Sequence, residues 1–133
     1  MEHLYAVFLL DIQDTLEHSA VAAKSGKRME EVFVGFISLL PDNFLEHHDI
    51  SFYADSLNIT TTYLSRVVRQ LTGRTVVGYV NQFLMMEATF LLRTSKMSIA
   101  QISDRLHFSD QAAFSKFFSR MQGESPREYR RKQ

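Results

Sequence analysis

The chain has 133 residues, of which 45% are hydrophobic and none is Cys, and its Lys and Arg residues equal its Asp and Glu residues in number. This length suits one domain, or a small domain with part of another, and the lack of Cys excludes disulfides and thiolate metal sites and fits a reducing cytoplasm. No apolar run approaches the length of a membrane span and no signal peptide is visible, so we expect a cytoplasmic protein without a membrane partner.

The balanced total charge hides an uneven distribution along the chain. Residues 1–49 carry nine acidic and three basic side chains, whereas residues 50–133 carry twelve basic and six acidic ones. A basic half suggests a polyanionic partner such as nucleic acid. Random scatter of surface charge is the alternative that the composition leaves open.

A helical hairpin is predicted before residue 46. Its first helix covers residues 3–24 and its second covers residues 29–40, with a further short turn after Pro41. Apolar residues recur at helical spacing in both helices: Leu4, Phe8, Ile12 and Leu16 in the first, and Phe33, Phe36, Ile37 and Leu40 in the second. The stripe on the first helix is wide, so it is either core or a face for a second copy of the chain.

The sequence Glu46-His47-His48-Asp49 invites a metal-site interpretation. Adjacent residues on a helix do not face each other, however, and no pair of His at positions i and i+4 is present. We interpret this segment as a polar hinge and expect neither a metal nor another cofactor.

A first helix-turn-helix unit is predicted over residues 50–73. Ser51 can cap its first helix, Asn58 suits a left-handed turn, and Thr60 can cap a second helix that Gly73 ends. The apolar residues of this second helix face inward. Its outward positions are Thr62, Ser65, Arg66 and Arg69.

Residues 75–94 then predict one long helix with an apolar stripe. Twenty residues at 1.5 Å each span about 30 Å, close to the roughly 34 Å of one turn of duplex DNA. Such a helix is either a rigid connector between two reading helices or a plain core helix.

The helix-turn-helix pattern returns with a period of 49 residues. Leu57 corresponds to Leu106 and Ile59 to Phe108, but the second unit has one more residue in or near its turn. Two such units in one chain are a more specific signal than one.

The second unit begins with a capping box formed by Ser98 and Gln101, and Ser109 is predicted to cap its second helix. The outward positions of that helix are Gln111, Ser115, Lys116 and Arg120. A packed inner face with polar and basic residues outside is what a helix needs to lie in the major groove of DNA.

A short last helix is predicted after Ser125-Pro126, where an N-cap precedes Pro at the first helical position. No strand pattern is convincing anywhere. The predicted fold is therefore all-α, with two helix-turn-helix subdomains joined by a long linker helix and preceded by a helical hairpin.

The stretch from about residue 50 to residue 131 resembles the AraC/XylS family of bacterial transcription regulators. The motifs that carry the resemblance are Phe108-Ser-Asp-Gln, Phe114-Ser-Lys-Phe-Phe and Gly123-x-Ser-Pro-x-x-Tyr-Arg in the second unit, and Tyr63-Leu64-Ser65-Arg66 and Thr72-Gly73 in the first. Two departures stand out: His107 replaces the usual Gly before the Phe of the second turn, and Ala112 leaves the second reading helix poor in hydrogen-bonding groups.

The resemblance implies a sequence-specific binder of double-stranded DNA that regulates transcription, with reading positions at Thr62, Ser65, Arg66 and Arg69 and at Gln111, Ala112, Ser115 and Lys116. Residues 49–133 would be the DNA-binding domain. Residues 1–48 would be the helical remnant of an N-terminal sensor and dimerisation domain, so we expect a piece of a longer chain. A homodimer through helix 3–24 and RNA polymerase are the further candidate partners.

Among the basic residues, Arg66 is the predicted base-edge contact, because Arg can donate two hydrogen bonds to guanine. The remaining basic candidates would neutralise phosphates: Arg69, Arg74, Lys96, Lys116 and Arg120. Ser109, at the turn of the second unit, is a further DNA-binding candidate. The alternative function is a helical protein-interaction module that binds RNA polymerase or another regulator. No Gly-rich phosphate loop, nucleophile–base pair or paired metal motif is legible, so no enzyme is predicted.

Overall fold

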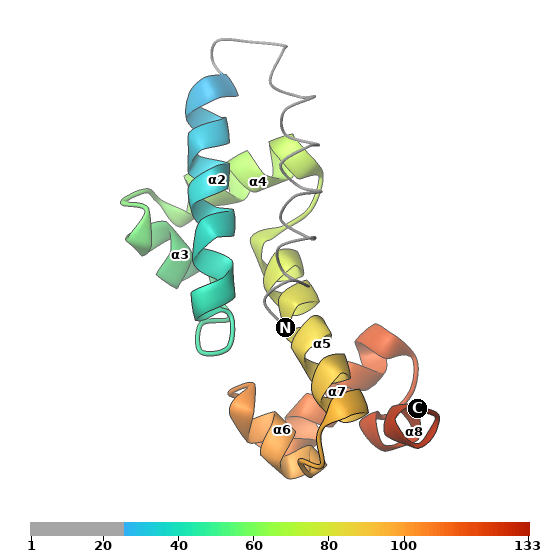
Figure 1. Ribbon diagram of the computed structural model, residues 1–133. Helices are drawn as coiled ribbons and strands as arrows, with labels where there is room; N and C mark the ends of the chain where they lie inside the picture. The colour runs from blue at the N-terminus through green and yellow to red at the C-terminus, as the bar shows by residue number, and fades with distance from the viewer. Residues whose placement is uncertain (1–25) are drawn as a thin grey trace. The chain divides into compact units, whose positions relative to one another are not determined.

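A computed structural model describes residues 26–133. Across this part of the chain every regular element is a helix, and no strand occurs. The helices are α2 (Gly26–Asn43), α3 (Ile50–Ser56), α4 (Thr61–Thr72), α5 (Val76–Thr94), α6 (Ile99–Arg105), α7 (Gln111–Gln122) and α8 (Pro126–Arg131), as Figure 1 shows. The predicted all-α architecture with two helix-turn-helix subdomains and a long linker helix is confirmed. The predicted helix 3–24 lies outside the described residues.

The chain divides into two compact units, one ending at Val80 and the other beginning at Asn81. The helix α5 contributes its first residues to the first unit and the rest to the second. The predicted boundary between residues 48 and 49 falls inside the first unit, because α2 packs against α4 there. The division into a sensor remnant and a DNA-binding domain therefore stays a prediction.

The first unit is built around buried aromatic rings. The ring of Phe36 on α2 meets Tyr53 of α3 and Tyr79 of α5 edge-on, with centroids 5.4 and 6.0 Å apart. Phe36 is fully buried, and truncation of such a ring to Ala costs about 3–5 kcal/mol. These ring contacts hold α3 and the start of α5 against α2. The helix α2 also packs against α4, which it crosses in Figure 1.

The predicted bounds of α2 were too narrow at both ends. The helix begins at Gly26 instead of Met29, and it continues through Pro41 to Asn43. Pro41 lacks the N–H that would bond to the carbonyl four residues earlier, but the helix ends only two residues later. The side chain of Asn43 donates to the carbonyl oxygen of Leu39 at 2.7 Å, which satisfies one of the last carbonyls.

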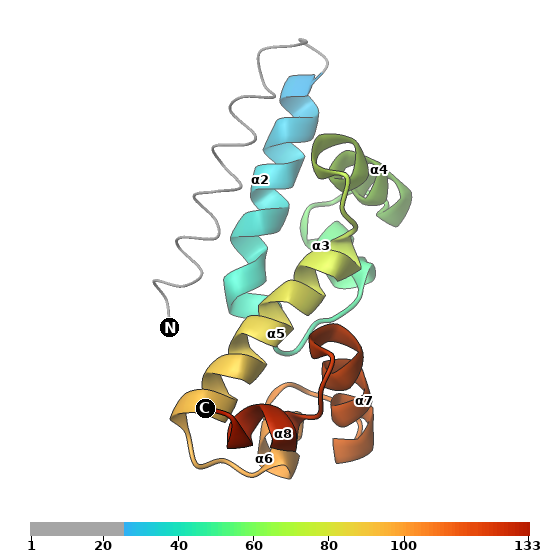
Figure 2. The ribbon, with the colours of Figure 1, turned by 90° about the vertical axis from the view of Figure 1, so that its right-hand side faces the viewer.

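The second unit has a core of Phe rings from α7 and its flanking turns. Phe114 lies 5.5 Å from Phe108 and 5.9 Å from Phe118, and Phe118 lies 5.6 Å from Tyr129 of α8. Figure 2 shows α6, α7 and α8 gathered around the C-terminal part of α5. The apolar face predicted for α7 is therefore the face that packs.

A charged side chain of α8 also stabilises the second unit. Arg130 of α8 donates to the carbonyl oxygens of Leu92 at 3.1 Å and Met97 at 2.6 Å, and at 3.4 Å to those of Leu91 and Ser95. It thereby caps the C-terminal end of α5, where cations are favoured by the helix dipole.

Glu87 is fully buried on α5, and its carboxylate accepts a hydrogen bond from Arg105 of α6 at 3.3 Å. Periodicity marked only the apolar residues of this face, so the buried carboxylate was not predicted. Its ion pair ties α6 to the linker helix within the second unit.

Candidate nucleic-acid interface

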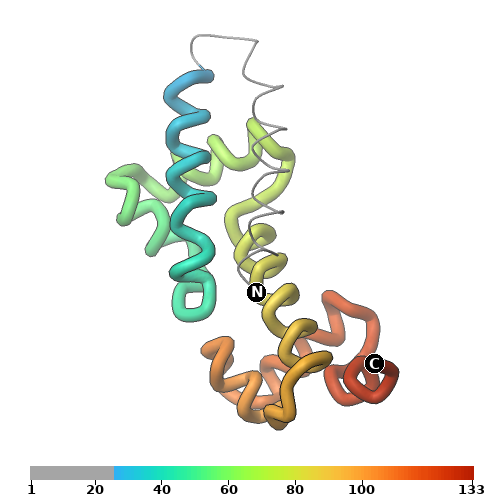
Figure 3. The backbone as a smooth tube through the Cα atoms, in the orientation of Figure 1, coloured from blue at the N-terminus to red at the C-terminus, as the bar shows by residue number. Residues whose placement is uncertain are grey.

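The turns of the two helix-turn-helix units share one backbone feature. Asn58 and His107 both adopt left-handed backbone, with φ angles of 56° and 60°. Immediately after each, a backbone N–H bonds back to the first helix, from Ile59 to Ala54 at 3.0 Å and from Phe108 to Ser103 at 3.1 Å. The left-handed turn predicted at Asn58 is confirmed, and its counterpart 49 residues later obeys the same geometry. Figure 3 traces both turns.

The second helix of each unit starts at a side-chain cap. The Thr60 hydroxyl accepts the N–H of Tyr63 at 3.0 Å, as predicted. In the second unit the cap is Asp110, whose carboxylate accepts the N–H of Ala113 at 2.7 Å. The predicted cap at Ser109 is therefore wrong, because the extra residue of this turn lies before the helix and shifts its start by one position.

The cap predicted at Ser51 is also wrong. The helix α3 begins at Ile50, with Asp49 in the N-cap position and no side-chain hydrogen bond there. The caps predicted at Ser98 and Ser125 are confirmed by hydrogen bonds to the N–H groups three residues later. At each of these two sites the cap residue is followed three positions on by Gln or Glu, which strengthens the signal.

The helices α4 and α7 both have twelve residues and both end at a left-handed glycine, Gly73 with φ 75° and Gly123 with φ 87°. Twelve residues make about 18 Å of helix. The diameter of an α-helix with its side chains, about 10–12 Å, fits the major groove of B-DNA, which is about 12 Å wide.

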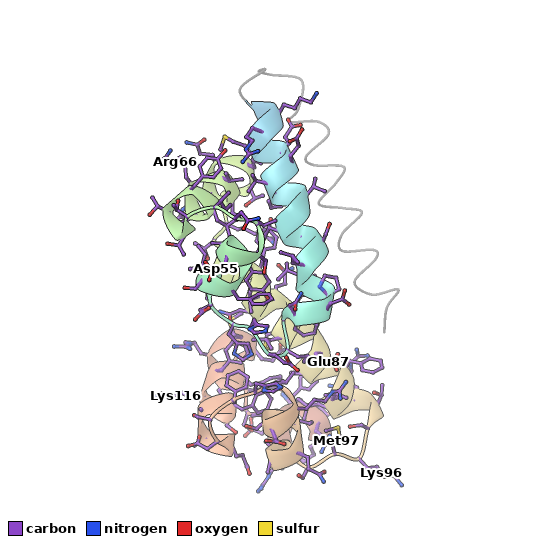
Figure 4. All side chains as sticks on the ribbon, turned by 90° about the vertical axis from the view of Figure 1, so that its left-hand side faces the viewer. Asp55, Arg66, Glu87, Lys96, Met97 and Lys116 are labelled. Atoms are coloured by element: carbon purple, nitrogen blue, oxygen red, sulfur yellow. The ribbon has the colours of Figure 1, made fainter. Side chains whose placement is uncertain are left out.

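The outward face of α4 carries the predicted residues. All four are exposed: Thr62, Ser65, Arg66 and Arg69. Figure 4 shows Arg66 projecting outward from this helix. No acidic residue interrupts α4, so its exposed surface is positively charged and rich in hydrogen-bond donors.

The outward face of α7 is also basic but less polar. Four of the predicted residues on it are exposed: Gln111, Ala112, Lys116 and Arg120. Ser115 is half-buried, and Ser109 lies exposed in the turn before the helix. Because Ala112, Lys116 and Arg120 are four residues apart, they share one side of α7, and no acidic residue interrupts that helix.

Arg74 and Lys96 lie outside the reading helices. Arg74 follows α4, with its guanidinium carbon 5.4 Å from the centroid of the Tyr79 ring, a cation–π arrangement. Lys96 is exposed in the loop between α5 and α6. Figure 4 shows Lys96 and Lys116 on opposite sides of the second unit, so this structure does not bring Lys96 to the exposed face of α7. Their phosphate contacts stay predictions.

Comparison of the two units reveals two candidates that the sequence reading missed. From the caps onward, residues of α4 and α7 correspond with a shift of 50. Gln111 then corresponds to Thr61, and Arg120 corresponds to Gln70, and both Thr61 and Gln70 are exposed. A period counted between Gly73 and Gly123, instead of between the apolar residues of the first helices, would have given this shift of 50.

The predicted polar hinge, residues 46–49, has specific contacts. The ring of His47 stacks on Phe52, with centroids 3.7 Å apart, and a nitrogen of His48 lies 3.1 Å from the carbonyl oxygen of Leu45. The hydroxyl of Tyr53 donates to the carbonyl oxygen of His47 at 2.8 Å. Within residues 26–133 no three His, Asp or Glu side chains are placed to hold a metal ion.

One basic residue near the end of the chain is engaged within the protein. The ammonium group of Lys132 lies 2.9 Å from a carboxylate oxygen of Glu124. The hydrogen bond to this carboxylate, and then its charge, raise the pKa of Lys132. This lysine is accordingly weaker than Lys116 as a candidate for a phosphate contact.

Among the helices described, none is by itself long and apolar enough to cross a membrane. Taken together, α4 and α5 have the length and composition of a membrane span, but they are bent by 72° at their junction.

A family model and two known proteins match this chain in sequence. A family model described as a helix-turn-helix domain matches residues 53–132. The Msm operon regulatory protein of Streptococcus mutans is 38% identical over 78 residues, which are 59% of this chain and 28% of that protein. The HTH-type transcriptional activator RhaS of Escherichia coli is 35% identical over 94 residues, which are 71% of this chain and 34% of that protein. The chain thus spans about a third of the length of these relatives.

Solved structures share the fold. The DNA-binding domain of AdpA, solved in complex with a target DNA, superposes with a TM-score of 0.67 and 25% identity, covering 78% of this chain and 90% of that one. Because residues 49–133 make up less than two thirds of the chain, a match that covers 78% of it also includes residues before position 49. An AraC-type regulator from Chromobacterium violaceum gives a TM-score of 0.69 at 24% identity, covering 77% of this chain and 92% of that one. Since the family model spans more than half of the sequence and the fold is that of AraC-type domains, the chain belongs to the AraC/XylS family of helix-turn-helix transcription regulators.

Proposed function

We propose that this chain binds double-stranded DNA sequence-specifically and regulates transcription, with α4 and α7 as its reading helices. The observation that supports this most strongly is the repetition itself. Each unit combines a left-handed turn, a capped twelve-residue helix and an exposed face with two cations and no acid within the helix. That arrangement suits a helix that enters the major groove and contacts flanking phosphates.

Arg66 is the proposed base-edge contact, because a guanidinium can donate two parallel hydrogen bonds to guanine. Thr62 and Ser65 lie on the same helix and add short polar groups. The remaining cations would neutralise phosphates: Arg69, Arg74, Lys96, Lys116 and Arg120. On α7 the proposed groove contacts are Gln111, Ala112 and Ser115, with Ser109 at the turn.

The wider assignments are proposals that rest on the relatives. RhaS is named a transcriptional activator, and we propose the same direction of regulation here, with RNA polymerase as a protein partner. We further propose that the protein acts in the cytoplasm and that it is not an enzyme. Residues 1–48 would derive from a sensor and dimerisation domain, with α2 completing the core of the first unit.

We also propose self-association through helix 3–24. The sequence there carries Leu4, Phe8, Ile12 and Leu16 at helical spacing, a stripe that a second copy could cover in a two-fold contact. Two linked copies would bind a doubled DNA site more tightly through their effective concentration.

A footprint on genomic DNA around the chain's own gene tests the proposal. A protected stretch at moderate salt, lost when competitor DNA carries the same sequence, is the expected result. Uniform weak protection of all DNA would contradict sequence-specific binding. No protection at any salt, together with capture of purified RNA polymerase, would favour the protein-interaction module instead.

A further inference from the structure

We infer that the two reading helices are not equivalent: α4 discriminates between base pairs, whereas α7 mainly anchors the protein to the DNA backbone. The inference rests on the proposed DNA-binding function and assigns different roles to the two units. Three differences between matched positions support it: the hydrogen-bonding groups on the exposed face, the burial of the serines, and the charge at the helix cap.

The matching of positions is fixed by the structure. Each helix has twelve residues between a capping side chain and a left-handed glycine, so Gly73 corresponds to Gly123. With this shift of 50, Arg66 corresponds to Lys116 and Ser65 to Ser115. Each pair occupies the same place on a helix of the same length, so differences in chemistry can be compared directly.

The exposed face of α4 has more groups that can read a base edge. At the second helical position α4 carries the hydroxyl of Thr62, and α7 carries the methyl group of Ala112, which offers no hydrogen bond. At the sixth position Arg66 presents a planar fork of donors, whereas Lys116 presents a point charge with freely rotating donors. The only base contact open to Ala112 is an apolar contact with the methyl group of thymine.

The serines of α7 are also less accessible than their counterparts. Ser65 and Arg69 are exposed on α4, whereas Ser115 and Ser119 are half-buried on α7. A half-buried hydroxyl reaches less far into a groove than an exposed side chain. Before Gln122, the last residue of the helix, the exposed polar side chains of α7 are therefore Gln111 and its two cations.

The helix caps differ in charge. Thr60 caps α4 with a neutral hydroxyl, whereas Asp110 caps α7 with an exposed carboxylate. The N-terminal end of a reading helix is the part that contacts base edges. A carboxylate there repels phosphates and the acceptor atoms of purines, so it opposes close approach of α7 to the DNA.

Selection of binding sites from random duplex DNA separates the two roles. For the purified full chain we expect one strongly specified block of bases. The matched variants are Arg66→Ala and Lys116→Ala, each the removal of an exposed side chain. Arg66→Ala should abolish the preference at one base pair. Lys116→Ala should weaken binding to all sequences alike and reduce the slope of log affinity against log salt by about 1, leaving the selected sequence unchanged.

A reciprocal exchange of caps tests the charge argument. Asp110→Ser and Thr60→Asp both retain a good N-cap, so circular dichroism should show folded protein in each case. Asp110→Ser should raise affinity at low salt about two- to threefold, since it removes one negative charge that faces a polyanion across several ångströms. Thr60→Asp should lower affinity by at least as much and reduce the base preference.

The outcomes distinguish the inference from the function on which it rests. Two equally specified blocks of bases, or a change of preferred base in Lys116→Ala as large as that in Arg66→Ala, would overturn the division of roles while leaving DNA binding intact. Recovery of no sequence and no measurable affinity at low salt would overturn the proposed function, and the inference with it. Unchanged affinity in both cap variants would refute the argument from charge, and with it the reason to expect α7 to lie further from the bases.

Discussion

Replacing His107 by Gly should stabilise the second unit, although it removes a side chain. His107 holds a φ angle of 60° in the turn between α6 and α7, and its side chain is exposed. A residue with a Cβ in the left-handed region costs about 1–2 kcal/mol. Gly adopts it freely but loses about 0.4–1 kcal/mol through the larger entropy of its unfolded state. We therefore expect a net gain of about 0.5–1 kcal/mol.

Denaturation by urea, followed by circular dichroism, measures this gain directly, and amide hydrogen exchange should place it in α6 and α7. Two variants calibrate the result. Asn58→Gly changes the matched turn at φ 56°, where Asn is already tolerated, so its gain should be smaller. Gly123→Ala adds a Cβ at φ 87° with no atom within 4 Å, so by the same two contributions it should lower the stability by about 0.5–1 kcal/mol. A loss of stability in His107→Gly would show that the imidazole makes contacts worth more than the backbone strain, and would refute the reasoning.

Three further predictions concern stability and assembly. Burial, and then the charge of Asp49, raise the pKa of Tyr53, so the folded state keeps a proton that the unfolded state releases above about pH 10. The free energy of unfolding should therefore fall as the pH rises above this value. Tyr53→Phe should flatten that pH dependence in urea titrations. Arg130→Met should lower the free energy of unfolding by about 2–3 kcal/mol, because four carbonyl oxygens lose a charged donor; a change below about 0.5 kcal/mol in the same assay would show that water replaces it. Phe8→Glu with Ile12→Glu should give a folded monomer in sedimentation experiments, whereas a wild type that is monomeric at high concentration would exclude self-association through helix 3–24.

Helix identity and the packed faces were predictable from the sequence because local signals agreed with the tertiary structure. The inward residues of α4 and α5 recur at helical spacing, and the buried members include Leu64, Val67, Phe83 and Leu91. Thr60 and Gly73 bound α4 as expected. These elements depend on short-range patterns of apolar, capping and glycine residues, which need no knowledge of the partners.

The positions that were missed depend on competition or on distant partners. Ser109 and Asp110 are adjacent and both can cap a helix, so only the length of the turn decides between them. Glu87 interrupts an apolar face, and its burial requires Arg105 from another helix. Tyr53 can be buried because its hydroxyl donates a hydrogen bond to the carbonyl oxygen of His47. A single-sequence pattern contains none of this spatial information.

The most direct test of DNA recognition is a titration of the wild-type chain, by fluorescence anisotropy, against the duplex recovered by selection and against a scrambled duplex of equal length, from low to moderate salt. With six to ten phosphate contacts, log affinity should fall against log salt with a slope of roughly −5 to −9. The selected duplex should bind at least about a thousandfold more tightly than the scrambled one. Equal affinity for the two duplexes, unchanged across the salt range, would contradict the assignment of this chain as a sequence-specific DNA-binding protein.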